Sequence, residues 1–443
     1  MRDLAFLAGY LALFPMALAS PLIAVMVVVW MSFLAPYNYL YGIANSLPLY
    51  MTSCVLMVVS SCLNPKNLTF RATPLHLLMI LFLVQGAISS AASPLSVSWD
   101  MLILLSKIVF LCFMVMLVVR NRLEIHTALL VVMLGLGFHA VVEGLKTIAS
   151  GGSHIVTGVP QLGDNNTFAA VMLMMAPIAF YLFKYMKVWW LRFGCLGAGL
   201  LCITATVGTL SRGAFIAMGV LGATAILRFK KRFRNSLLIV AAAGLIATLA
   251  PERWYSRIDT IESADQDTSF MGRIEAWQMS TVIALDRPLT GLGFRTMEVG
   301  NVWDSYVPQF QLLFPESKKR TDQPRAHAAH SIIFQVLGDL GFVGLIIFLM
   351  ILFNAFKDVY SVRRLTRMQP DKSWMYDLSG AFELTLLAYV VCGIALSVAY
   401  YESFFILISL IASLRRLALA PASQQEMVAE NISTGPIAGH ARP

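Results

Sequence analysis

The chain has 443 residues, of which 58% are hydrophobic and only 13% are charged. Ordinary soluble domains carry about 25% charged residues, so this chain cannot hide its apolar surface in a globular core and is predicted to be an all-α polytopic membrane protein. In a soluble protein, the net charge of +9 would suggest binding to nucleic acid. In a membrane protein, basic residues first indicate which connections lie in the cytoplasm, so no nucleic-acid partner is expected.

Thirteen apolar segments follow one another, several of them short, and together they predict about twelve transmembrane helices. They run near residues 4–20, 22–34, 47–63, 74–92, 99–119, 127–149, 168–186, 188–209, 213–228, 236–250, 330–356, 380–399 and 403–419. If 4–20 and 22–34 are both full spans, the N-terminus lies outside despite Arg2. A half-span, or one element kinked around Pro15 and Pro21, is the alternative.

Basic residues predict the orientation, because short cytoplasmic connections are rich in Lys and Arg. The connection at 228–234 holds five basic residues and is therefore placed inside. Alternation puts four further basic connections on the same side, which carry Lys66, Arg71, Arg120, Arg122, Lys184, Lys187, Arg192, Lys357, Arg363, Arg364, Arg367 and Lys372. The outer side receives 35–46, 93–98, 150–167, 210–213 and 251–329.

The interval 251–329 is the one long polar stretch, and it divides the chain. We expect N-terminal transmembrane helices over 1–250, a periplasmic loop domain over 251–329, C-terminal transmembrane helices over 330–419 and a disordered cytoplasmic tail over 420–443. Within the loop, residues 272–285 have helical apolar spacing, and Arg287-Pro288 would stop that helix. Pro308, Pro315 and Pro324 indicate an irregular second half.

Two residues at the edges of apolar segments are candidate catalytic groups. Arg212 interrupts an apolar stretch, where an arginine costs about 2.5–3.5 kcal/mol near a bilayer, so an anionic partner is expected; the plain alternative is a turn arginine that reaches the lipid headgroups. His330 begins the helix after the loop, where the helix dipole keeps an imidazole neutral and suits it as a general base.

Further polar residues on the outer side are candidate substrate ligands. Lys107 and Lys146 could add positive charge to a phosphate site, although Lys146 can simply pair with Glu143 on one helix face. Asp164, Asn165 and Asn166 offer acceptors and amides to sugars, or form a turn and helix cap. Arg325 and His327 end the loop before His330. His327 and His330 lack a third ligand nearby, so no metal site is predicted.

Neither a Walker loop nor a Mg²⁺-type pair of acidic residues is present in the sequence, so no cofactor is predicted. The six cysteines all lie in apolar runs without metal-ligand spacing and are expected to pack as small hydrophobes.

At these residues the chain resembles the O-antigen ligase family. The resemblance is carried by Ser211-Arg212-Gly213, by Gly272-Arg273 with Trp277, and by His330-Ser331 followed by Asp339-x-Gly341-x-x-Gly344. Most of the chain is similar in hydropathy, but the similarity is sharp only from about 160 to 350. Ser331 replaces the common Asn, and Asp339 replaces the common Glu.

The resemblance implies a GT-C-like, metal-independent, inverting glycosyltransferase that moves O-antigen glycan from undecaprenyl pyrophosphate to lipid A–core in the bacterial inner membrane, with its site facing the periplasm. Arg212, Arg273 and His330 would be its catalytic residues. An O-antigen polymerase or a protein O-oligosaccharyltransferase would use the same donor chemistry. A secondary transporter or flippase for an anionic lipid could also present Arg212, Lys107 and Lys146 to a cavity, but transport does not require a long one-sided loop ending in a histidine.

Overall fold

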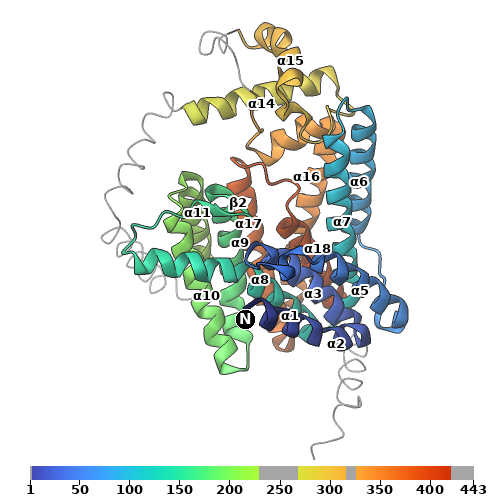
Figure 1. Cartoon of the computed structure of the whole chain (residues 1–443), viewed down its shortest axis with the longest axis vertical. Coiled ribbons are helices and arrows are strands. Elements are labelled where there is room, and N and C mark those ends of the chain that lie inside the picture. Colours follow the sequence, from blue (N-terminus) through green and yellow to red (C-terminus); the bar gives the residue numbers. More distant parts are fainter. Residues whose placement is uncertain (1, 229–267, 316–325, 421–443) are drawn as a thin grey trace, which may run out of the picture.

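The structure, a computed structural model, describes residues 2–228, 268–315 and 326–420, and in these ranges it is a helical bundle (Figure 1). The larger helices are α1 (Arg2–Ala12), α2 (Phe14–Ala19), α3 (Pro21–Leu34), α5 (Leu49–Leu63), α6 (Pro74–Ala92), α7 (Val97–Val118), α8 (Arg122–Ala149), α9 (Asn165–Tyr185), α10 (Trp189–Gly208), α11 (Arg212–Arg228), α14 (Thr268–Asp286), α15 (Gly300–Leu313), α16 (Ile332–Thr366), α17 (Ser373–Gly393) and α18 (Glu402–Leu419). The short elements are α4 (Ile43–Ser46), the 3-10 turns η1 (Pro36–Asn38), η2 (Pro65–Asn67), η4 (Thr296–Glu298) and η6 (Pro370–Lys372), and the antiparallel strands β1 (Gly158–Val159) and β2 (Gly163–Asp164).

Eight helical segments of the described chain are long and apolar enough to cross a membrane, and three further apolar helices are shorter. The predicted class, an all-α polytopic membrane protein, is therefore confirmed. The count of about twelve spans and the GT-C-like arrangement stay predictions, since the segment 236–250 lies outside the described residues. The basic cluster at 229–234 and the predicted domain boundary at 250 lie outside them as well.

The connections expected on the outer side come together at one end of the bundle, which we call the loop end. Four hydrogen bonds join them: Tyr37 Oη to Gln161 (2.9 Å), Ser93 Oγ to Thr296 Oγ1 (3.0 Å), Asn165 Nδ2 to Thr209 O (2.9 Å) and Arg287 Nη1 to Ala92 O (3.1 Å). The helices α14 and α15 lie together beyond the start of α16 at this end (Figure 1).

The basic connections meet at the opposite end, which we call the basic end. The contacts there include Lys184 and Tyr185 with Asp377, Arg122 over the rings of Tyr185 and Trp374, Thr69 N–H to Leu117 O, and Arg416 with the carbonyls of Thr69 and Val119. Segregation of this kind is what alternating spans with basic connections on one side produce.

The first two apolar segments run in opposite directions between the two ends of the bundle, and this decides at which end the N-terminus lies. Asp3 accepts a hydrogen bond from the backbone N–H of Tyr41 at the loop end (3.2 Å). The carbonyl of Leu18 accepts one from Asn64 Nδ2 at the basic end (2.9 Å). Helices α1 and α2 therefore run from the loop end to the basic end with a break at Leu13, and α3 returns. The N-terminus lies with the outer connections, despite Arg2.

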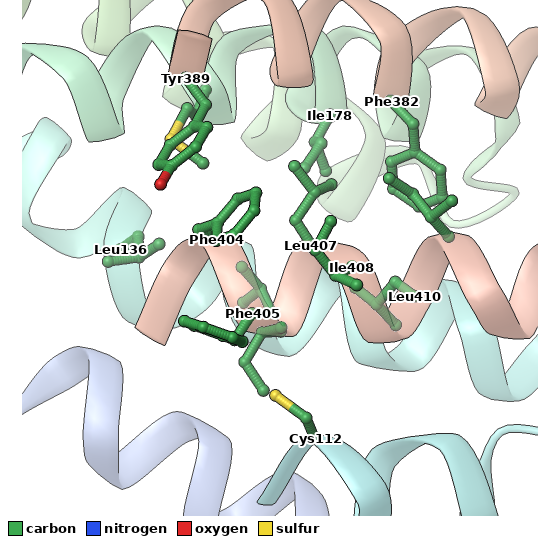
Figure 2. Packing of buried hydrophobic residues seen from close by; sticks show 14 of the residues in the cluster. Cys112, Leu136, Ile178, Phe382, Tyr389, Phe404, Phe405, Leu407, Ile408 and Leu410 are labelled. Carbon is green, nitrogen blue, oxygen red and sulfur yellow. The ribbon is translucent and has the colours of Figure 1, made fainter. Parts of the chain in front are cut away.

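The C-terminal helix α18 forms the centre of the bundle, with 14 of its 18 residues buried. Figure 2 shows Phe404 and Phe405 of α18 among Tyr389 of α17, Cys112 of α7 and Leu136 of α8. The ring of Phe404 stacks on that of Tyr389 with centroids 4.1 Å apart. A helix that is apolar on every side is expected in such a buried position. The start of α18 is thereby fixed next to the loop end.

The described part of the long polar interval has a small apolar core of its own. The predicted helix over 272–285 is confirmed as α14, which ends before Arg287-Pro288. The prediction of an irregular second half is wrong for Gly300–Leu313, because α15 continues through Pro308. An interior proline costs about 3 kcal/mol, whereas burying Trp303, Tyr306 and Phe310 contributes about 1.5–3 kcal/mol each, so burial decides.

Candidate functional site

His330 lies at the loop end, between the loop segment and α16. Its backbone is in the left-handed region with φ 45°, and its N–H donates to Ser397 Oγ at 2.8 Å. Ser331 is the N-cap residue of α16, so His330 precedes the first helical residue, Ile332, by two positions. The sequence placed His330 at this junction, and the hydrogen bond to the α17–α18 connection fixes its backbone there.

Charged residues from three other segments lie within electrostatic range of His330 and shift its pKa. Burial lowers the pKa of the imidazole below its ordinary value of 6.5, and the charge of Arg273 lowers it further. Asp164 acts in the opposite direction, His327 lowers the pKa again, and Glu298 raises it. The structure thus places three predicted residues, Arg273, Asp164 and His327, within electrostatic range of His330, together with Glu298, which was not predicted. At neutral pH the imidazole is neutral and can accept a proton.

The Gly-Arg-x-x-x-Trp element holds α14 against the residues before His330. The indole N–H of Trp277 donates to Ala329 O at 2.8 Å, and its ring stacks on Phe334 of α16 with centroids 5.2 Å apart. A Cβ on Gly272 would lie 3.5 Å from His327 Nε2, so the helix approaches the histidine closely here. Arg273 therefore lies on a helix that packs against the residues before His330 at Gly272 and at Trp277.

A break in α16 receives the loop that follows α14. Gly341 has φ 67° and ψ −169°, and a Cβ at this position would lie 2.6 Å from Pro288 O. Backbone hydrogen bonds join the loop to the break: Leu292 N–H to Gly338 O (3.0 Å), Gly293 N–H to Asp339 O (2.8 Å) and Phe342 N–H to Pro288 O (2.9 Å). The Asp-x-Gly sequence thus has an architectural role, because only glycine adopts this backbone without strain.

The carboxylate of Asp339 completes this attachment. Its Oδ2 accepts from Tyr400 Oη at 3.0 Å, and its Oδ1 accepts from the backbone N–H of Arg295 at 3.1 Å. The left-handed backbone of Arg295, with φ 55°, turns its side chain toward Glu298, which accepts from Nε (2.9 Å) and Nη2 (2.8 Å). This pair was not among the residues predicted from the sequence. The signal that could have found it is Gly291-x-Gly293-Phe-Arg295, where both glycines have positive φ.

The Asp164 stretch is a helix cap, as the plain reading predicted. Asp164 Oδ1 accepts from Thr167 N–H at 2.9 Å at the start of α9, and Asn166 Nδ2 lies 3.4 Å from Asp164 Oδ2. Asn165 instead donates to the carbonyl of Thr209 at 2.9 Å. Asp164 also raises the pKa of His330. Because Asn165, the next residue, bonds to Thr209, the turn before α11 lies close to this cap.

Arg212 is the first residue of α11, two residues after Leu210 with its left-handed φ of 54°. Ser211 Oγ accepts from Ala214 N–H at 3.3 Å, as expected for a capped turn. Through Asn165 and Thr209, Arg212 lies on the same face of the molecule as Asp164.

These residues fall within a region that matches a known family. Residues 197–349 match the family model described as O-antigen ligase, a range that contains Arg212, Arg273, His330 and Asp339. This match supports the assignment of the chain to the O-antigen ligase family. A second match, over residues 1–187, is to a family of unknown function (DUF5935). No curated protein matches the chain.

Two predicted ligands, Lys146 and Lys107, make their described contacts away from His330. Lys146 pairs with Glu143 (2.7 Å), whose other oxygen lies 2.7 Å from His154 Nε2, which confirms the pairing predicted for that helix face. Lys107 is exposed on α7, and its charge acts on Cys54 of α5. Arg325 lies outside the described residues.

Proposed function

We propose that the protein is an inverting, metal-independent glycosyltransferase that moves O-antigen glycan from undecaprenyl pyrophosphate to lipid A–core. The observation that carries the proposal is the gathering of Arg273, Asp164 and His327 around a half-buried, neutral His330, within the O-antigen ligase match. The pyrophosphate linkage already stores the energy of transfer, so neither ATP nor another cofactor is required.

In the proposed reaction, the acceptor hydroxyl oxygen attacks the anomeric carbon while the bond from that carbon to the pyrophosphate oxygen breaks. The electron pair of the broken bond leaves with the pyrophosphate, and the hydroxyl proton passes to His330. Arg212 and Arg273 stabilise the negative charge that develops on the leaving group. One displacement inverts the anomeric configuration, so no protein nucleophile takes part.

The side of the membrane follows from charge. Short connections rich in Lys and Arg stay in the cytoplasm, and in this chain they meet at the basic end. We therefore place the loop end, with His330, on the periplasmic face of a bacterial inner membrane. An undecaprenyl chain can lie between helices there while its pyrophosphate remains at the membrane surface.

The test supplies purified protein with undecaprenyl-pyrophosphate-linked glycan and lipid A–core, in EDTA and without ATP. We expect a glycan-bearing lipopolysaccharide band that is lost in His330→Ala, Arg212→Ala and Arg273→Ala, each expressed in the membrane. His154→Ala, a histidine at the same end that pairs with Glu143, is the matched control and should retain the band. Near-normal product in any one of the three variants removes that residue from the site.

Other products would redirect the assignment. Lengthening of the glycan on undecaprenyl would identify a polymerase, and transfer to a Ser or Thr of a protein would identify a protein O-oligosaccharyltransferase. A transporter should tolerate His330→Ala far better than Arg212→Ala and should yield no new glycosidic bond.

A further inference from the structure

The pair formed by Arg295 and Glu298 is built into the site by its backbone. The N–H of Arg295 is bound by the buried carboxylate of Asp339 (3.1 Å), and the preceding residue, Phe294, donates its N–H to Ser98 Oγ of α7 (2.9 Å). The left-handed φ of 55° is unusual for arginine and is held by these two contacts. The direction of the Arg295 side chain is therefore set by the fold rather than chosen among surface rotamers.

Both side chains keep unused hydrogen-bonding capacity. A guanidinium has five N–H donors, and the Nε and one Nη2 hydrogen of Arg295 are used by a single oxygen of Glu298. Within the described part of the chain, the other three donors and Glu298 Oε1 make no hydrogen bond. About half of the Arg295 side chain is exposed, so these groups can reach a ligand.

The pair is within electrostatic range of His330 and of Tyr401. The charge of Glu298 acts on His330, and the charge of Arg295 acts on Tyr401. Tyr401 in turn touches the Asp164 stretch, since its hydroxyl is 3.5 Å from Leu162 O and a Cβ on Gly163 would lie 3.4 Å from it.

The charge balance of the pair distinguishes its ligand from the donor pyrophosphate. Glu298 neutralises Arg295 at 2.8 Å, so the pair has no net charge with which to attract a polyanion. A donor next to an acceptor, without net charge, is instead complementary to neighbouring hydroxyls, each of which both donates and accepts. A sugar presents such hydroxyls, whereas a Ser or Thr acceptor presents only one.

We propose that Arg295 and Glu298 bind the acceptor as a saccharide, Arg295 donating to one ring hydroxyl and Glu298 accepting from its neighbour, so that a third hydroxyl faces His330. This inference rests on the proposed function and gives that site its acceptor class. Tyr401 bounds the same subsite on the side of the Asp164 stretch.

The experiment titrates two ligands separately by calorimetry, at pH 8 so that His330 is neutral in every variant. The ligands are the lipid A–core oligosaccharide and inorganic pyrophosphate, and the variants are Arg295→Gln and Glu298→Gln. Removing a hydrogen bond to a charged group weakens binding by about tenfold or more, so each variant should bind the oligosaccharide at least about tenfold more weakly and pyrophosphate unchanged. Their thermal stability should not change, because the Arg295 N–H to Asp339 bond is retained.

The matched control is Lys184→Gln, which breaks another half-exposed pair, with Asp377, at the basic end. It should bind both ligands like the wild type. Oligosaccharide binding that is unchanged in both site variants, or pyrophosphate binding that falls with it, overturns the inference. These titrations measure binding and need no turnover. They can therefore contradict this inference without contradicting the proposed function, which is contradicted when the wild type transfers no glycan.

Discussion

The imidazole of His330 can accept a proton only while it is neutral, and its neighbours decide the pH at which that holds. Burial and Arg273 lower its pKa, whereas Asp164 and Glu298 raise it. Arg273 thus serves twice in the proposed reaction, as a cation for the leaving pyrophosphate and as the charge that keeps the base unprotonated. Because Arg273 and Asp164 shift the pKa of His330 in opposite directions, the pH dependence of activity tests whether both act on it.

We expect transfer activity to rise with pH through the pKa of His330, with a midpoint below 6.5, and to be flat at neutral pH. Asp164→Asn removes a charge that raises this pKa, so the acid limb of kcat/KM should move to lower pH. Arg273→Gln removes a charge that lowers it, so the limb of its residual activity should move to higher pH. Profiles of kcat/KM between pH 4.5 and 8 check both shifts; limbs that move in the same direction in the two variants would contradict the assignment of His330 as the base.

At the scale of elements, the site depends on how the loop after α14 is attached to the break in α16. Three backbone hydrogen bonds and the Asp339 carboxylate hold residues 288–295 there. The side-chain amide of Gln85 in α6 donates hydrogen bonds to Leu289 O (2.6 Å) and Leu340 O (3.0 Å). The loop, α6 and α16 are therefore joined to one another. The described contacts of the Asp-x-Gly motif are therefore structural, because they attach the loop to α16.

Gly341→Ala should detach this loop. The left-handed backbone costs about 1–3 kcal/mol for a residue with a Cβ, and that Cβ would meet Pro288 O at 2.6 Å. We expect lower thermal stability in detergent, measured by tryptophan fluorescence, together with loss of most transfer activity. Gly197→Ala in α10, where a Cβ meets nothing within 4 Å, is the control and should be neutral or slightly stabilising. Wild-type stability in Gly341→Ala would show that the break is not needed.

The whole molecule is organised as a bundle with chemically different ends. The basic end carries ion pairs such as Arg415 with Asp358 and Arg363 with Glu383, while the loop end carries His330 and its neighbours. The central helix α18 connects the two, because its first residues follow Tyr400 and Tyr401 and its last turn holds Arg416 against the basic connections.

Cysteine reporters at the two ends test which one faces the periplasm. Ser305→Cys in α15 should react with a membrane-impermeant maleimide in intact cells, and Ser373→Cys at the start of α17 should react only after permeabilisation. The background carries Cys62→Ser, since Cys62 is the exposed native cysteine. That background alone should stay unlabelled, and the reverse labelling pattern would overturn the periplasmic placement of the site.

The sequence by itself determined the membrane class and the helix that ends before Arg287-Pro288, and it singled out His330 and Arg273 as candidates. These features are local, because apolar length, a helix-stopping proline and short motifs are all written in neighbouring residues. The helix over Gly300–Leu313 was missed because its proline argued against it locally, and only the burial of Trp303, Tyr306 and Phe310 in the tertiary structure compensates.

Only the tertiary structure decided which candidates meet. Asp164 and His330 are far apart in the sequence and come together because α9, α16 and α18 pack around one core. The place of Arg295 and Glu298 depends on Asp339 and on the break at Gly341, which the two glycines before Arg295 do not reveal by themselves. The Lys146–Glu143 pair, by contrast, is local, and its three-residue spacing on one helix face predicted it.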